Sequence, residues 1–251
     1  MIHEYLEYPT KEQWIDIEEH SKINHLYLDI KRPEITDFFA LFTEHELASW
    51  VRLFNNRLGQ SRTSYIFFMH YYNKGIPDKE WYISPGKEGQ SIQYFPHFTK
   101  DETINYKVMF DYYVDAFYYK FFSAWDTIFH IINIQYQFDI ETSKDFNRKI
   151  LTNLNSVNPV LKRQINKTNN SKAFKRSRVL RNDITHNFAP NDISSGISKK
   201  KENGKLKKIS FGVGNYTPSN EFVENIDGII EEFIKFLNVF KRSLEATEKK
   251  G

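Results

Sequence analysis

The sequence of 251 residues contains no cysteine. This absence excludes disulfide bonds, thiolate-ligated zinc, iron–sulfur clusters and a cysteine nucleophile. No run of 18 apolar residues is present, so we expect no membrane-spanning helix. The N-terminal residues MIHEYLEYPTKEQ are acidic where a secretory signal peptide would be basic and then apolar. We therefore expect a soluble, cytoplasmic protein that does not contact membranes.

Several catalytic signatures are also missing. The 10 glycines are scattered, and Gly212-Val213-Gly214 does not open a helix at the spacing of a dinucleotide site. Neither His-Glu-x-x-His nor Gly-x-Ser-x-Gly occurs. His20 and His25 point about 140° apart on a helix, which is poor geometry for ligating one metal ion. Glu44-His45-Glu46 has no second histidine at ligand spacing. We therefore expect neither a metal ion nor a cofactor.

Aromatic residues are abundant, and the basic charge is concentrated in one segment. Phe, Tyr and Trp make up 16% of the chain, which favours a packed core over disorder. The formal net charge is only +3. Residues 161–210, however, contain 14 Lys/Arg and 3 Asp/Glu, a net charge of +11, so the other 201 residues carry −8. A basic segment within an acidic chain is typical of a surface that binds a polyanion, although a solvated lysine-rich loop is the simpler alternative.

Residues 1–100 are expected to form an accessory region that packs on the rest of the chain. Residues 34–56 have the apolar spacing of a helix. Further on, Trp81 and Ile83 lie across a Pro/Gly-rich turn from Ile92 and Tyr94, which predicts a β-hairpin. No residues of this region have catalytic spacing.

Residues 101–251 are expected to form an antiparallel helical bundle, which makes the protein mainly α. Apolar residues recur every three or four positions along long stretches, and Thr217-Pro218 is a helix start signal. Asn203-Gly204 lies within a run of lysines and predicts a second, basic hairpin, inserted at about 195–213. The predicted helices are 103–137, 143–154, 158–166, 170–187 and one that begins at 217–218.

A row of polar residues is predicted on one face of the helix 103–137. Asp111, Asp115, Asp126 and His130 share this face by their spacing. Such a row could bind a metal ion, but we favour a solvated or interface-facing ridge.

One segment combines a basic amphipathic helix with a histidine near its end. Residues 172–187 contain Arg181-Asn182-Asp183-Ile184-Thr185-His186, in which four residues separate an arginine from a histidine. This segment resembles the HEPN superfamily, whose helical bundles carry an Arg-x4–6-His motif, usually with Asn, Asp or His after the arginine. Asn182 matches that preference. The resemblance covers approximately residues 101–248.

The resemblance implies a metal-independent endoribonuclease whose active site lies between two subunits of a homodimer. Family members act as toxins of toxin–antitoxin pairs or as effectors of phage defence, so an antitoxin or a defence complex is a further expected partner. Histidine exchanges protons near neutral pH, and arginine can stabilise charge on a phosphoryl group. We therefore expect Arg181 and His186 to be catalytic and Asn182 to assist. The expected RNA-binding residues are Lys172, Lys175, Arg176 and Arg178 on the helix, and Lys199, Lys200, Lys201, Lys205, Lys207 and Lys208 on the hairpin.

The spacing of the motif constrains how its two residues can act together. On one helix, Arg181 and His186 lie about 140° apart in azimuth and about 7.5 Å apart along the axis. Either the helix end near Pro190 redirects His186, or the motifs of two copies combine across a two-fold axis.

Other interpretations of the motif stay open. His186 could be a helix C-terminal histidine favoured by the macrodipole, and Arg181 could pair with Asp126 or Asp115. The domain could then be a non-catalytic RNA- or nucleotide-binding module, or a dimerisation module of a larger complex. Some toxins of the HEPN superfamily carry Arg-x4-His-x-Tyr, in which a partner nucleotidyltransferase adenylylates the tyrosine hydroxyl. Phe188 stands at that position and has no hydroxyl, which disfavours that route of inhibition.

Overall fold

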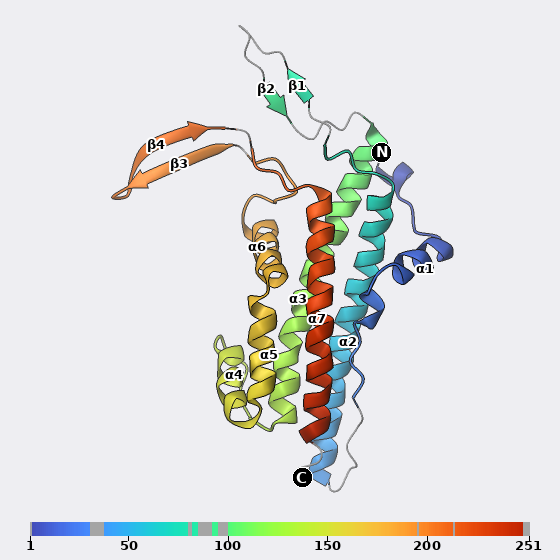
Figure 1. Ribbon diagram of the computed structural model, residues 1–251, viewed down its shortest axis with the longest axis vertical. Helices are drawn as coiled ribbons and strands as arrows, with labels where there is room; N and C mark the ends of the chain where they lie inside the picture. Colours follow the sequence, from blue (N-terminus) through green and yellow to red (C-terminus); the bar gives the residue numbers. More distant parts are fainter. Residues whose placement is uncertain are drawn as a thin grey trace.

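Three long helices form the frame of the structure, a computed structural model (Figure 1). Helix α2 (Phe38–Asn73) runs antiparallel to α3 (Asp101–Gln135) and to α7 (Ser219–Thr247). Helices α5 (Pro159–Asn170) and α6 (Lys172–His186) follow one another in the direction of α2 and complete the bundle. The antiparallel helical bundle predicted from the sequence is thus confirmed. The structure describes residues 2–30, 38–79, 82–84, 92–94, 100–194, 196–212 and 214–247.

Short elements cover the outside of this frame. Helix α1 lies beside α2, and α4 lies beside α5 on the opposite side of the molecule (Figure 1). Two separate antiparallel hairpins, β1–β2 and β3–β4, extend from the bundle. The bounds are η1 (Ile2–Tyr5), α1 (Lys11–Glu19), η2 (Ile23–His25), β1 (Tyr82–Ser84), β2 (Ile92–Tyr94), α4 (Phe146–Val157), β3 (Ile197–Glu202) and β4 (Lys205–Phe211). The hairpin expected around Ile83 and Ile92 is present, whereas Trp81 and the turn lie outside the described residues.

Helix α2 is longer than the helix predicted at 34–56, of which residues 34–37 lie outside the described part of the chain. The polar residues Ser61, Thr63 and Ser64 obscured its continuation. In the structure each of their hydroxyls donates a hydrogen bond to the carbonyl oxygen four residues earlier, at 3.0–3.1 Å. These side chains are therefore satisfied within the helix itself, and the helix continues through them. The second half of α2 then buries an aromatic face against α3.

Buried aromatic rings fix α6 to the two long helices beside it. Phe174 of α6 is fully buried, and its ring centroid lies 5.0 Å from that of Trp125 and 5.8 Å from that of Phe121, both on α3. Phe233 of α7 packs against the same two rings. Burying a phenylalanine of this size contributes roughly 2–3 kcal/mol, so the position of α6 is strongly determined by its apolar face.

A buried polar contact also joins α3, α6 and α7. Asn225 on α7 accepts a hydrogen bond from the Tyr118 hydroxyl at 2.8 Å and donates one to the Ala173 carbonyl at 3.0 Å. Close by, Gly228 permits a near approach, because a Cβ added there would lie 3.2 Å from the Ala173 Cβ. The start of α6 is therefore held against α7 by both hydrogen bonding and backbone proximity.

The basic hairpin predicted from Asn203-Gly204 is present as the β3–β4 ribbon, residues 197–211. Asn203 and Gly204 have φ values of 51° and 75°, as a tight turn of this kind requires. At the base, the Ser194 N–H donates to the Asn215 carbonyl at 3.0 Å, and the Gly212 N–H donates to the Gly196 carbonyl at 2.9 Å. The ribbon therefore leaves the bundle as a paired structure.

Candidate active site and nucleic-acid interface

The motif lies on α6, whose limits are set by its caps. The Ser171 side chain accepts a hydrogen bond from the Phe174 N–H at 3.3 Å at the N-terminus. At the C-terminus Asn187 is extended, and its N–H donates to the Asp183 carbonyl. Both Arg181 and His186 therefore lie within regular helix, and the helix end does not redirect His186. The backbone at His186 follows the helix, so it shows no redirection of this residue by the helix end.

Arg181 is directed toward α3. Its guanidinium carbon lies 6.0 Å from the centroid of the Phe122 ring, and its Nη1 donates to the Asn182 Oδ1 at 3.4 Å. The residue is half-buried, while Asn182 is exposed. Stacking beside an aromatic ring restricts a guanidinium while leaving its N–H groups able to donate. Asn182 thus contacts the arginine of the motif.

His186 is exposed in the last turn of α6. Its ring makes no hydrogen bond to any other residue in the described part of the chain. Its ring nitrogens are therefore accessible to a ligand.

Arg181 acts electrostatically on Asp126 of α3. Although Asp126 is accessible to water, desolvation by the surrounding side chains raises the pKa of its carboxyl, and the charge of Arg181 opposes this shift. Arg178 and Arg57 oppose it in the same way. Among the described residues, no ion pair within 4 Å joins these arginines to Asp126. The alternative of a direct Arg181–Asp126 pair is therefore replaced by a looser arrangement, three guanidinium groups around one carboxylate.

Arg57 was not identified from the sequence. It lies on α2, and its Nη1 donates to the Ser123 carbonyl at 2.9 Å and to the Thr127 hydroxyl, both on α3. Arg57 and Arg181 are 124 positions apart in the chain, so no local pattern links them. The only sequence signal is an arginine within a long helix that is otherwise largely apolar on its inner face.

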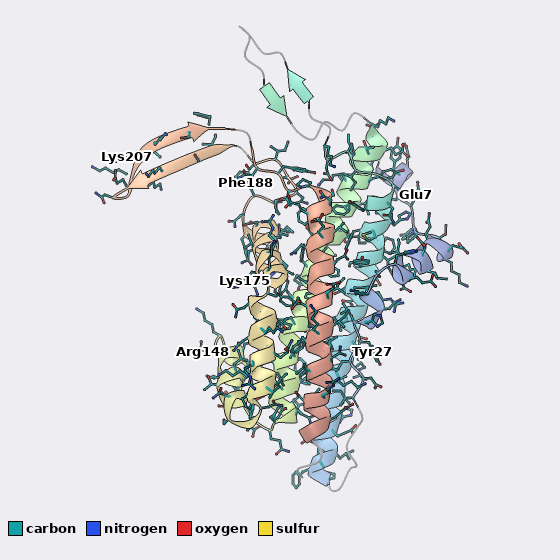
Figure 2. The ribbon with its side chains drawn as sticks, in the orientation of Figure 1. Glu7, Tyr27, Arg148, Lys175, Phe188 and Lys207 are labelled. Atoms are coloured by element: carbon teal, nitrogen blue, oxygen red, sulfur yellow. The ribbon has the colours of Figure 1, made fainter. Side chains whose placement is uncertain are left out.

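The predicted RNA-binding residues occupy two surfaces, α6 and the ribbon. Lys172 and Lys175 are exposed on α6, whereas Arg176 forms an ion pair with Glu221 at 3.3 Å and Arg178 donates to Asn169. In Figure 2, Lys175 lies on α6, Lys207 lies toward the far end of the ribbon, and Phe188 lies between the two. The ribbon lysines are all exposed: Lys199, Lys200, Lys201, Lys205, Lys207 and Lys208.

The polar row on α3 divides into separate environments. In the N-terminal half of α3, Asp111 forms an ion pair with the buried Lys107. Burial raises the pKa of Asp111 to about 6 and the pKa of Asp115 to about 7. Farther along, the His130 ring stacks on Trp50 with centroids 4.1 Å apart, and burial lowers its pKa. No three His, Asp or Glu side chains in the described residues are arranged to hold a metal ion.

Two cavities lie away from the motif. One, of about 400 Å³, is between residues 27–30 and the first half of α2, and the other, of about 390 Å³, is beside α4. Neither is lined by a predicted site residue. Within the motif, Arg181 is half-buried, whereas Asn182 and His186 are exposed.

The described helices form an antiparallel bundle, and one of them, α6, carries the Arg-x4-His sequence that resembles the HEPN motif. The family model of the Cthe2314-like HEPN domain matches residues 50–249, and the chain belongs to this family. No curated protein and no solved structure matches the chain. In the part of the chain that the structure describes, no helix is long and apolar enough to cross a membrane.

The family match begins within α2, about fifty residues before the region in which the resemblance was found. It therefore includes the part of α2 that carries Arg57 and packs against α3. The division of the chain into an accessory region 1–100 and a bundle 101–251 stays a prediction.

Proposed function

We propose that the protein is a cytoplasmic, metal-independent endoribonuclease that acts as a toxin or as an antiviral-defence effector. The observation that carries this proposal is the Arg181–His186 pair on α6, with the arginine held beside Phe122 and the histidine exposed. Family membership supports it, since HEPN domains are often ribonucleases.

The side chains match the requirements of cleavage by the 2′-OH of RNA. His186 exchanges the proton of the attacking hydroxyl or of the leaving 5′ oxygen. Arg181 places a permanent positive charge on the phosphoryl oxygens as negative charge develops there. Asn182, within hydrogen-bond reach of the Arg181 guanidinium, limits its orientation. The products would be a 2′,3′-cyclic phosphate and a 5′-hydroxyl, and no metal or cofactor takes part.

A homodimer would bring two motifs to one substrate. Because α6 is helical through His186, the two residues of one motif diverge by about 140°. A two-fold axis beside α6 would place the histidine of one subunit near the arginine of the other, in an interface where each subunit contributes the same surface.

Cleavage in EDTA tests the enzymatic proposal. We expect the wild type to cut unstructured RNA, and Arg181→Ala or His186→Ala to cut at least about 100-fold more slowly. The matched controls Arg148→Ala and His45→Ala remove exposed residues of the same types on α4 and α2 and should cut normally. If the wild type leaves RNA intact, or cuts no faster than both motif variants, the proposal is wrong.

Mixing the two motif variants tests the composite site. A heterodimer of Arg181→Ala and His186→Ala contains one site with an intact arginine and an intact histidine, so activity should return on mixing. Light scattering at micromolar concentration should show a dimer. A strict monomer, or no recovery on mixing two proteins that do exchange subunits, would exclude the shared site.

A non-catalytic RNA- or nucleotide-binding module is the second candidate. The exposed lysines of α6 and the ribbon support it, because they need no catalytic pair to attract a polyanion. In that case the protein would bind RNA with a steep dependence on salt and would not cut it. A purely structural dimerisation module would show neither property.

A further inference from the structure

The β3–β4 ribbon extends away from the bundle and has almost no buried surface (Figure 1). Every residue from Ile197 to Phe211 is exposed except Ser210, which is half-buried. A two-stranded ribbon is at best marginally stable in water. With six lysines and one glutamate, its net charge is +5. An exposed surface with this charge attracts polyanions.

A β-bulge decides which side chains share a face of the ribbon. Lys199 pairs with Ile209 and Lys200 with Lys208, but after a register shift Lys201 pairs with Leu206. Lys207 is the extra residue of the longer strand. Residues opposite one another lie on the same face, and alternate residues of a strand do too. The shift therefore places Leu206 on the face of Ile209 and Phe211; without it, Leu206 would lie on the opposite face.

The ribbon thus has one mixed apolar face and one polar face. The apolar face carries Leu206, Ile209 and Phe211, whose exposed fractions are 51%, 46% and 80%. Lys199 and Lys201 lie between them on this face. The polar face contains the directly paired Lys200 and Lys208, and also the Ser198–Ser210 pair. Apolar side chains alternate with lysines on this exposed face. The face is therefore chemically complementary to a ligand that has both apolar and anionic parts.

We propose that this apolar face binds the unpaired bases of single-stranded RNA while the ribbon lysines contact its phosphates. The inference rests on the proposed function in taking RNA as the ligand. Single strands offer the flat faces of their bases next to a charged backbone, and aromatic side chains stack on these faces. A duplex encloses the base faces and presents phosphates and polar groove edges, against which Leu206 and Phe211 would gain nothing.

The charges of the ribbon favour RNA over a second copy of the ribbon. Lys207 pairs with Glu202, but Lys199, Lys200, Lys201, Lys205 and Lys208 have no carboxylate partner within the described residues. The positive charges of the lysines on both strands repel the ribbon of a second copy. This repulsion disfavours edge-to-edge pairing of two ribbons. Phosphates neutralise the same charges.

The position of Phe188 links the ribbon to the motif. This side chain is 67% exposed, follows His186 by two residues, and lies between α6 and the ribbon in Figure 2. A strand of six or seven residues extends roughly 20 Å, so a bound single strand that follows the ribbon toward its base approaches the last turn of α6.

Binding measurements with uncleavable RNA test this inference. The probes are a fluorescein-labelled 2′-O-methyl 20-mer of uridine and a 20-base-pair 2′-O-methyl duplex, followed by fluorescence anisotropy in EDTA. The variant Leu206→Thr/Phe211→Thr keeps strand-forming residues and every charge. We expect it to weaken single-strand binding by about 5- to 100-fold and to leave duplex binding unchanged.

Two controls isolate the apolar face. Lys200→Ala/Lys208→Ala should weaken binding of both probes, and Val157→Thr, at an exposed apolar position on α4, should weaken neither. Equal weakening of both probes by the Thr variant, unchanged single-strand affinity, or no binding of either probe to the wild type would overturn the inference. The inference would also be wrong if Leu206→Thr/Phe211→Thr bound both probes normally but had a lower assembly mass by light scattering. The apolar face would then bind a second copy of the protein.

These outcomes are separate from those of the cleavage assay. If the wild type cuts RNA while the Thr variant binds single strands normally, the inference fails and the proposed enzyme stands. If single-strand binding depends on Phe211 and no RNA is cut, the enzyme fails and the inference stands.

Discussion

Replacing Asp115 by Asn should stabilise the protein at pH 8 but not at pH 5. Asp115 is half-buried on α3, and no described residue hydrogen-bonds to its buried Oδ1. Burial raises its pKa to about 7, and the neighbouring charge of Asp111 acts in the same direction. Lys107, whose charge opposes the rise in pKa of both carboxyls, already pairs with Asp111. At pH 8 the fold therefore contains an Asp115 charge that is poorly compensated.

The magnitude follows from the linkage between protonation and folding. A rise in pKa from 3.8 to about 7 corresponds to about 4 kcal/mol of lost stability once the group is ionised in both states. Because an amide at this position is also desolvated, we expect Asp115→Asn to gain about 2 kcal/mol at pH 8. The folded protein holds this proton more tightly than the unfolded chain does. This contribution to stability is therefore complete below about pH 4 and is lost as the pH rises toward 7.

Urea unfolding at pH 5 and pH 8, followed by far-UV circular dichroism at one protein concentration, measures the effect. The free energy of unfolding of the wild type should fall relative to that of Asp115→Asn as the pH rises. Asp29→Asn, at an exposed aspartate, is the matched control and should show no such difference. A gain of the same size at both pH values, or a variant less stable than the wild type at pH 8, would refute the reasoning.

Three further substitutions test the packing that positions the motif helix, each measured by urea unfolding. Phe174→Ala should lower the free energy of unfolding by about 3–5 kcal/mol because it leaves a cavity among buried rings, whereas Val179→Ala on the exposed face of the same helix should change it little. Asn225→Ala should lower it by about 2–3 kcal/mol, since two buried hydrogen bonds are lost, and the exposed Asn238→Ala on the same helix should not. Gly59→Ala should raise it by about 0.5–1 kcal/mol, because this glycine is exposed inside a helix and nothing lies within 4 Å of an added Cβ. Equal effects of a substitution and its control, or a loss of stability in the glycine variant, would contradict these assignments.

The helices and the ribbon could be predicted because their signals are local. The recurrence of apolar residues every three or four positions predicted α3 to within two residues at each end. Asn203-Gly204 predicted the turn of the ribbon, and Thr217-Pro218 predicted the start of α7 to within one or two residues. The main underestimate was α2, where Ser61 and its polar neighbours interrupt the apolar pattern although their hydroxyls are bonded within the helix.

The site could be predicted only in part, because its surroundings come from distant parts of the chain. The motif predicts Arg181 and His186 as site residues, and helical geometry indicates that they diverge. That Arg181 would lie beside Phe122 and near Asp126 depends on how α6 packs against α3, which no local pattern encodes. Arg57 enters the same region from α2 for the same reason. The bulge that moves Leu206 to the apolar face is likewise a property of strand pairing, which composition does not reveal.

The two ends of the ribbon meet at its base. Ser194 and Asn215 exchange two hydrogen bonds of 3.0 and 2.8 Å, and the Thr217 N–H donates to the Pro190 carbonyl at 2.7 Å. The chain leaves the bundle and re-enters it at one place. Adding or removing residues within the ribbon therefore does not change the distance between the two points at which the ribbon joins the bundle. The ribbon can thus be lengthened, recharged or removed as a separate unit. A change in the length or charge of the ribbon would therefore leave the packing of the motif helix unaltered.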